Sequence, residues 1–206
     1  PNQFDLHAHS TASDGTLTPS VLMQRACNAG VAKARGQYVV LLNNDVEVTN
    51  GWLDALIDAF GRFGNVGLVG SKLLYPDGKL QDAGGIIWGT GNPWNYGNGQ
   101  NPWEPRFSYA RQADYLSGAA MMTTKDIWDE VGGLSSYLEP MYFEDTDFAF
   151  KIRDAGYSTW FVPASVVYHY EGMTSGTDTR KKSGVPAELN NTRAPTMNEA
   201  RPTGPV

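Results

Sequence analysis

Apolar runs and helical spacings divide the chain into a patterned middle and two flanking segments. The uninterrupted apolar run 38–42 predicts a buried strand of the parallel kind, and residues 66–74 predict a second strand. Strand and helix alternate along the middle of the chain, so the pattern predicts the α/β class. A helix is predicted over 51–63 because five apolar residues fall on one face: Leu53, Leu56, Ile57, Phe60 and Phe63.

Shorter segments extend this pattern in both directions. The remaining expected elements are strands over 86–88 and 159–162, a strand or turn near 115–122, helices over 125–131 and 144–155, and a long loop over 89–105. Loops of that length in compact domains are usually functional or disordered. Thr18 as N-cap and Pro19 at the first helical position predict a helix that ends at Gly30.

Composition narrows the class of protein. A chain of 206 residues that is 41% hydrophobic is long enough for one domain with a proper core. The net charge of -6 argues against a general nucleic-acid binder, which needs a basic face. A single cysteine excludes an internal disulfide, and no apolar run approaches the ~20 residues of a membrane helix. With no signal peptide visible, we expect a cytoplasmic domain without a transmembrane segment.

Asn43, Asn44 and Asp45 follow the first apolar strand directly. In open α/β sheets ligands bind at the carboxyl ends of strands, and an Asp there suits a divalent cation that bridges two phosphates. Asn and Asp also favour turns, so by itself the triplet has an equally simple structural interpretation.

A second acidic cluster opens the predicted helix at 144–155. Glu144, Asp145 and Asp147 follow an aromatic pair. Three acidic residues are more than favourable interaction with the helix dipole requires. Asp145 shares a helical face with Ala149 and Ile152, so it is expected at the mouth of a site with an apolar floor, where it can act as a general base. His169, between two tyrosines, would by itself be a packed, hydrogen-bonded residue; with Asp45 it could complete a metal site.

Small and aromatic residues supply further candidate contacts. Ser117, Gly118 and Ala119 permit close approach of the backbone to a ligand. Trp94 and Trp103, in the long loop, offer flat apolar faces for sugar rings, although ordinary core burial is the alternative.

Taken in order, these motifs resemble the family-2 glycosyltransferases of the GT-A fold, and the rhamnosyl- and galactofuranosyl-transferring members most closely. The resemblance covers residues 26–179 and is carried by several segments in the right order: Ala34–Val48, the Gly-Ala pair at 118–119, Val131–Leu134, Phe143–Phe148 with Arg153–Gly156, and Tyr168–Gly172. It implies a partial GT-A, Rossmann-like mixed sheet flanked by helices. The implied activity is inverting, metal-dependent transfer from a nucleotide-sugar donor to a glycan acceptor in cell-surface polysaccharide assembly.

The resemblance also implies roles for particular residues. Asp45, with Asn43 and Asn44, matches the family's Asp-X-Asp site and would bind Mn²⁺ or Mg²⁺ together with His169. Asp145 matches the catalytic base, with Glu144 beside it. Gly118 and Ala119, with neighbouring Ser117, would line the donor sugar and acceptor.

Both ends depart from the family, and they divide the chain into residues 1–30, 31–179 and a linker-like tail over 180–206. The family's first strands, which form most of its nucleotide pocket, are not recognisable. Residues 4–31 instead resemble the opening of PHP-family phosphoesterases, where His7, His9 and Asp14 would bind metal. The N-terminal β-α unit is therefore expected to be a replacement.

This chimeric character leaves two alternatives open: a non-catalytic recombined or engineered fold, and a phosphoesterase remnant. An incomplete sheet would expose an edge, so we also expect a homodimer or exchange of the N-terminal segment between chains.

Overall fold

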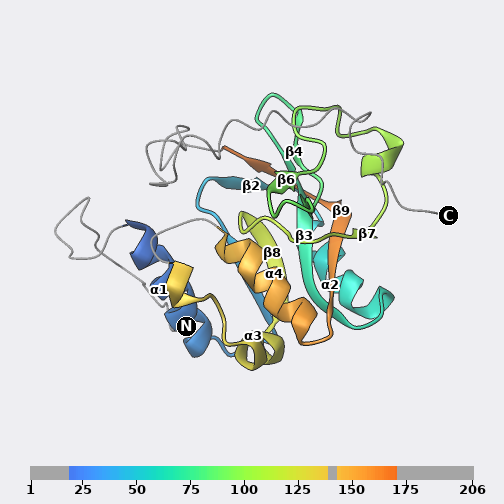
Figure 1. The fold of residues 1–206 in the computed structure, drawn as a ribbon. Helices are drawn as coiled ribbons and strands as arrows, with labels where there is room; N and C mark the ends of the chain where they lie inside the picture. Colours follow the sequence, from blue (N-terminus) through green and yellow to red (C-terminus); the bar gives the residue numbers. More distant parts are fainter. Residues whose placement is uncertain (1–18, 139–142, 171–206) are drawn as a thin grey trace, which may run out of the picture.

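The computed structural model describes residues 19–138 and 143–170 (Figure 1). They form a mixed seven-stranded sheet and a separate two-stranded sheet, with helices against both faces of the larger sheet. The helices are α1 (Pro19–Lys33), α2 (Trp52–Arg62), α3 (Lys125–Val131) and α4 (Glu144–Asp154), with short 3₁₀ turns at Pro105–Phe107 and Ser136–Leu138. The strands are β1 (Tyr38–Leu42), β2 (Val46–Val48), β3 (Val66–Leu74), β4 (Leu80–Asp82), β5 (Gly85–Ile87), β6 (Pro93–Asn95), β7 (Arg111–Gln112), β8 (Ala120–Thr124) and β9 (Ser158–His169).

The large sheet has the order β1-β8-β3-β9-β2, with β4 added to β3 and β7 added to β9. β3 and β9 run parallel, whereas the other pairs between its described strands are antiparallel. The predicted α/β class is confirmed. The expectation of a buried parallel strand at 38–42 is wrong, because β1 lies at the end of the sheet and pairs antiparallel with β8. An apolar run reports that a strand contacts a core but carries no information about the direction of its neighbour.

β3 is the centre of the core. All nine of its residues are buried, and it contacts β4, β8 and β9. Two of its glycines are needed for packing, since a Cβ at Gly67 would come within 2.5 Å of Ile152 and one at Gly70 within 2.8 Å of Leu116. α4 and the Leu116 segment can therefore lie directly against the strand.

β9 is much longer than the predicted strand at 159–162. Pro163 directly follows the predicted strand, yet β9 continues to His169 through an irregularity: Ser71 is paired with Val162, but Lys72 with Val166. The extra residues accommodate the proline, which cannot donate a ladder hydrogen bond. Ser165 within this irregularity is buried, and its Oγ lies 2.7 Å from Ser71 Oγ. The continuation carries the end of β9 alongside β2.

The helices match their predictions closely. α2 covers one face of the sheet, with Leu56 and Ala59 buried against β3 and β9, but Leu53 and Ile57 on the edge of its apolar face remain 38% and 36% exposed. On the opposite face α4 buries Phe148, Ala149 and Ile152 (Figure 1). The described helices include none long and apolar enough to cross a membrane.

α1 begins at Pro19, as predicted, but continues past Gly30 to Lys33. The side chain of Asn28 donates to Leu134 O at 2.9 Å and accepts from Leu134 N at 3.0 Å, so the helix is attached to the segment after α3. Beyond the glycine, Val31 is buried in the core, so the added turn of the helix takes part in the packing. The strand predicted before it lies outside the described residues, as does the tail at 180–206.

The predicted long loop at 89–105 contains a hairpin. β6 pairs antiparallel with β5, with Ile86 opposite Trp94. Short three-residue strands separated by Gly and Pro give too little alternation to be recognised in a sequence.

Candidate active site

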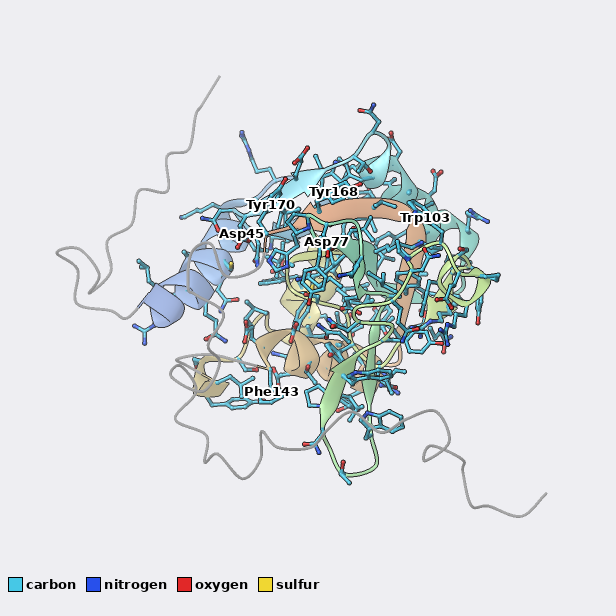
Figure 2. The ribbon with its side chains drawn as sticks, turned by 90° about the horizontal axis from the view of Figure 1, so that it is seen from above. Asp45, Asp77, Trp103, Phe143, Tyr168 and Tyr170 are labelled. Atoms are coloured by element: carbon cyan, nitrogen blue, oxygen red, sulfur yellow. The ribbon has the colours of Figure 1, made fainter. Side chains whose placement is uncertain are left out.

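The register between β2 and β9 brings Asp45 and His169 together. Val46 is paired with His169 across these strands, and Tyr170 N donates to Asp45 O at 2.9 Å. Figure 2 shows Asp45 beside Tyr168 and Tyr170, at the end of β9. Two residues that are more than a hundred positions apart in the chain therefore share one corner of the sheet.

The imidazole of His169 is enclosed by three polar side chains. Its Nε2 lies 3.2 Å from Asp45 Oδ1 and 3.3 Å from Asn43 Nδ2, and its Nδ1 lies 2.9 Å from Gln81 Oε1. The side chains of His169 and Asp45 are 12% and 13% exposed. Both ring nitrogens thus have polar partners, and little of the ring reaches solvent.

Asp45 Oδ1 is buried and accepts no hydrogen bond from the described residues, although His169 Nε2 is near. An amide nitrogen can only donate, so the contact from Asn43 makes Nε2 an acceptor. With Nε2 as an acceptor, its lone pair lies 3.2 Å from Asp45 Oδ1, and a cation that binds there in place of the Asn43 N–H would satisfy both atoms. A divalent cation with oxygen and imidazole ligands fits this arrangement, because cis ligands about 2.1 Å from an octahedral ion lie about 3.0 Å apart.

The second acidic residue of the site, Asp145, sits in the first turn of α4. Its Oδ2 accepts from Gly118 N at 3.1 Å and its Oδ1 from Thr146 N at 2.7 Å. Burial, and next the negative charge of Glu144, raise the pKa of Asp145 to about 6, against the lowering effect of these hydrogen bonds. A carboxyl with that pKa is ionised at neutral pH and is a stronger base than an ordinary aspartate.

Residues 117–119 connect the two parts of the site. Asn43 N donates to Ala119 O at 3.0 Å, while Gly118 N donates to Asp145. Ser117 Oγ accepts from Ala119 N at 3.3 Å and so fixes this bend. A Cβ at Gly118 would meet Asp145 Cβ at 3.6 Å, which shows how closely the backbone approaches that carboxylate.

Two polar residues of β4 belong to the same region and were not predicted. Gln81 contacts His169, and Asp82 is 1% exposed, with a buried Oδ1 that accepts no hydrogen bond from described groups. Burial and the charge of Asp145 raise the pKa of Asp82 to about 7, opposed by a hydrogen bond from Gly84 N and by the charge of Arg111. All three positions of β4 are buried, but this burial is a property of the fold, so no local pattern in the sequence marked Gln81 and Asp82 as site residues.

The remaining predicted residues lie in varied places. Asn44 is exposed in the turn after β1, and Glu144 has a buried Oε2 without a described hydrogen-bond partner. Trp94 is half-buried in β6, its ring centroid 6.0 Å from that of Tyr96. His7, His9 and Asp14 lie outside the described residues.

Trp103 lies apart from this cluster. It is 66% exposed, and in Figure 2 it lies on the opposite side of the picture from Asp45. There it lines a cavity of about 560 Å³ beside α2 and β9, whose lining includes Lys72 and Tyr109 but none of the other predicted site residues. The Lys72 ammonium lies 5.1 Å from the centroid of the Trp103 ring.

Metal ligands are few within this site. No group of three or more His, Cys, Asp or Glu side chains gathers as a metal site in residues 19–138 and 143–170. Asp45 and His169 could therefore supply two ligands of a cation, and the others would have to come from substrate and water, as is common where hard cations bind phosphates.

The mixed sheet, the helices on both faces and the Asn-Asn-Asp segment after β1 define an α/β protein of the GT-A type. A solved structure titled "Crystal structure of GalNAc-T7 with UDP, GalNAc and Mn2+" is similar, with a TM-score of 0.57 and 20% identity over 72% of this chain and 30% of that one. The model of the family described as "Glycosyl transferase family 2" matches residues 22–131. The chain belongs to glycosyl transferase family 2.

Two similar proteins come from bacteria. An uncharacterized protein, y4gI, of Sinorhizobium fredii is 37% identical over 155 residues, which are 72% of this chain and 17% of that protein. The N-acetylglucosaminyl-diphospho-decaprenol L-rhamnosyltransferase of Mycobacterium tuberculosis is 28% identical over 156 residues, which are 68% of this chain and 49% of that enzyme. The chain thus spans half or less of these relatives.

The family match begins within α1, inside the segment that resembles a phosphoesterase opening. These similarities give that second resemblance no support.

Proposed function

We propose that this chain carries a metal-dependent, inverting sugar transfer from a nucleotide-sugar to a glycan acceptor. The observation that carries the proposal is the unsatisfied Asp45 Oδ1 facing His169 Nε2, connected through residues 117–119 to the buried base Asp145. Family membership supports sugar transfer, and the Mn²⁺ and UDP named for the GalNAc-T7 structure support the cation and the donor class.

In the proposed reaction Asp145 removes the proton of an acceptor hydroxyl as its oxygen attacks the anomeric carbon. The bond between that carbon and the diphosphate oxygen breaks on the opposite side, so the configuration inverts and the nucleoside diphosphate leaves with the bonding electrons. Mn²⁺ or Mg²⁺ held by Asp45 and His169 would supply positive charge to the diphosphate. Gly118 donates its N–H to Asp145 and keeps the carboxylate oriented.

Calorimetric titration of UDP- and dTDP-sugars in the presence of Mn²⁺ tests the donor site. The parent chain should give saturable, metal-dependent binding that Asp45→Ala abolishes. Asp77→Ala is the matched control, since Asp77 is an exposed turn residue paired with Lys79 at 2.9 Å and should bind as the parent does. Flat traces for the parent, or equal losses in both variants, would contradict the proposal.

A second candidate is a domain that binds a metal and nucleotide without turnover. The position of β1 favours it, because β1, which directly precedes Asn43 to Asp45, pairs only with β8 among the described strands. A family-2 transferase with further strands beside β1 would have a more enclosed nucleotide pocket. Metal-dependent titration together with no release of nucleoside diphosphate in the presence of acceptor would select this candidate.

A further inference from the structure

We propose that Gln81 is a positioning residue that fixes the tautomer of His169 and so directs the Nε2 lone pair toward Asp45 and a divalent cation. The part of this inference that concerns the cation rests on the function proposed above, whereas the part that concerns the tautomer is independent of it. Gln81 would act through the imidazole rather than by touching substrate.

The contacts around the ring agree on one tautomer. Gln81 Oε1 can only accept, so at 2.9 Å it places the proton on Nδ1. Asn43 Nδ2 can only donate, so at 3.3 Å it requires the lone pair on Nε2. Two side chains from different parts of the chain therefore favour the same tautomer. If the Gln81 amide were reversed, the proton of the imidazole would lie on His169 Nε2, which would donate to Asp45. The experiment below separates the two tautomers.

Gln81 is held firmly enough to impose this choice. It is 3% exposed, in a strand whose three residues are all buried. Hydrogen bonds fix the backbone of β4: Leu80 N donates to Gln100 O at 2.9 Å, and Asn98 Nδ2 donates to Gln81 O at 3.0 Å.

The consequence concerns the metal site. A ligating histidine usually donates its other N–H to a fixed acceptor, and loss of that acceptor typically lowers metal affinity by about 10–100-fold. With Nε2 already 3.2 Å from Asp45 Oδ1, the two ligand atoms are arranged before any ion binds. Gln81 thus belongs to the metal site although it would not itself be a ligand.

Long-range ¹H–¹⁵N spectra of the histidine rings test the tautomer in metal-free protein. The chain has three histidines, and His169→Gln assigns the relevant signals. The parent should show His169 with the proton on Nδ1, and Gln81→Leu should transfer it to Nε2. Gln81→Glu retains an acceptor and should keep the parent tautomer, and Gln112→Leu, on exposed β7, should leave the spectrum unchanged.

Mn²⁺ affinity is then measured by electron paramagnetic resonance of the free ion. Gln81→Leu should weaken binding about 10–100-fold, while Gln81→Glu and Gln112→Leu stay close to the parent. Proton on Nε2 in the parent overturns the inference, as does Gln81→Leu without effect on tautomer and affinity. A tautomer that responds to Gln81 in protein without Mn²⁺ affinity would support the positioning role and reject the metal. Should Gln81→Leu not fold, the parent spectrum and Gln81→Glu still decide the tautomer.

Discussion

Asp45 and Asp145 are both acidic residues of the candidate site, yet their surroundings prepare them for different tasks. Asp45 faces an imidazole lone pair and lacks a described hydrogen-bond donor at one oxygen. Asp145 has two backbone N–H donors but is desolvated beside Glu144, and its pKa is raised. The first carboxylate is arranged to receive a cation and the second to receive a proton. Side-chain type alone would not separate them; their neighbours do.

The largest effect is expected at the base. Asp145→Asn keeps the shape of the side chain but removes the proton acceptor, so transfer should fall about 10²–10⁴-fold. Its single amide oxygen can accept from only one of the two N–H groups, of Gly118 and Thr146, that the carboxylate binds. Release of nucleoside diphosphate in the presence of acceptor measures the rate. Metal-dependent donor binding should stay near the parent value, with Asp77→Asn as control. A loss of donor binding as large as the loss of rate would mean that the two carboxylates do not have separate roles.

Asp82→Asn tests how strongly burial raises the pKa of the Asp82 carboxyl. Because the pKa of Asp82 is raised from 3.8 to about 7, the folded state keeps a proton that the unfolded chain releases. The free energy of unfolding should therefore fall as pH rises from about 4 to about 7, by on the order of 4 kcal/mol.

Urea unfolding at several pH values, followed by circular dichroism, measures this slope. Asp82→Asn resembles the protonated side chain and should flatten the profile and stabilise the protein at neutral pH. Parallel profiles for parent and variant would show that Asp82 ionises normally and that β4 is better solvated than its packing indicates.

The pH dependence of the transfer rate tests whether Asp145 is the base. Asp145 must be ionised to act as a base, so the rate should rise with pH through a midpoint near 6. Glu144→Gln removes a negative charge that raises the pKa of Asp145, and the midpoint should move to lower pH. Initial rates between pH 4.5 and 8 provide the profile. A shift toward higher pH would assign the raised pKa to another neighbour.

The smallest effect is expected at the segment between the two carboxylates. The added methyl of Gly118→Ala would lie 3.6 Å from Asp145 Cβ, an ordinary contact, so the free energy of unfolding should change by no more than about 0.5 kcal/mol. Gly70→Ala is the contrasting variant, since its Cβ would meet Leu116 at 2.8 Å and should destabilise the protein by about 1–3 kcal/mol. Thermal unfolding compares both. Equal destabilisation would indicate that residues 117–119 are as tightly packed as β3.

The candidate roles of Asp45, Asp145 and His169 came from the resemblance to family-2 transferases. The sequence pattern alone determined the α/β class, the strands at 38–42 and 66–74, and the helices over 51–63, 125–131 and 144–155. These features are local, because apolar periodicity and capping residues act within one element. Only the tertiary structure decided that β1 is antiparallel, that β9 continues past Pro163 to His169, and that Gln81 and Asp82 lie beneath the site. Strand direction, register and the surroundings of a buried side chain depend on partners far away in the chain, and a local pattern carries no record of those partners.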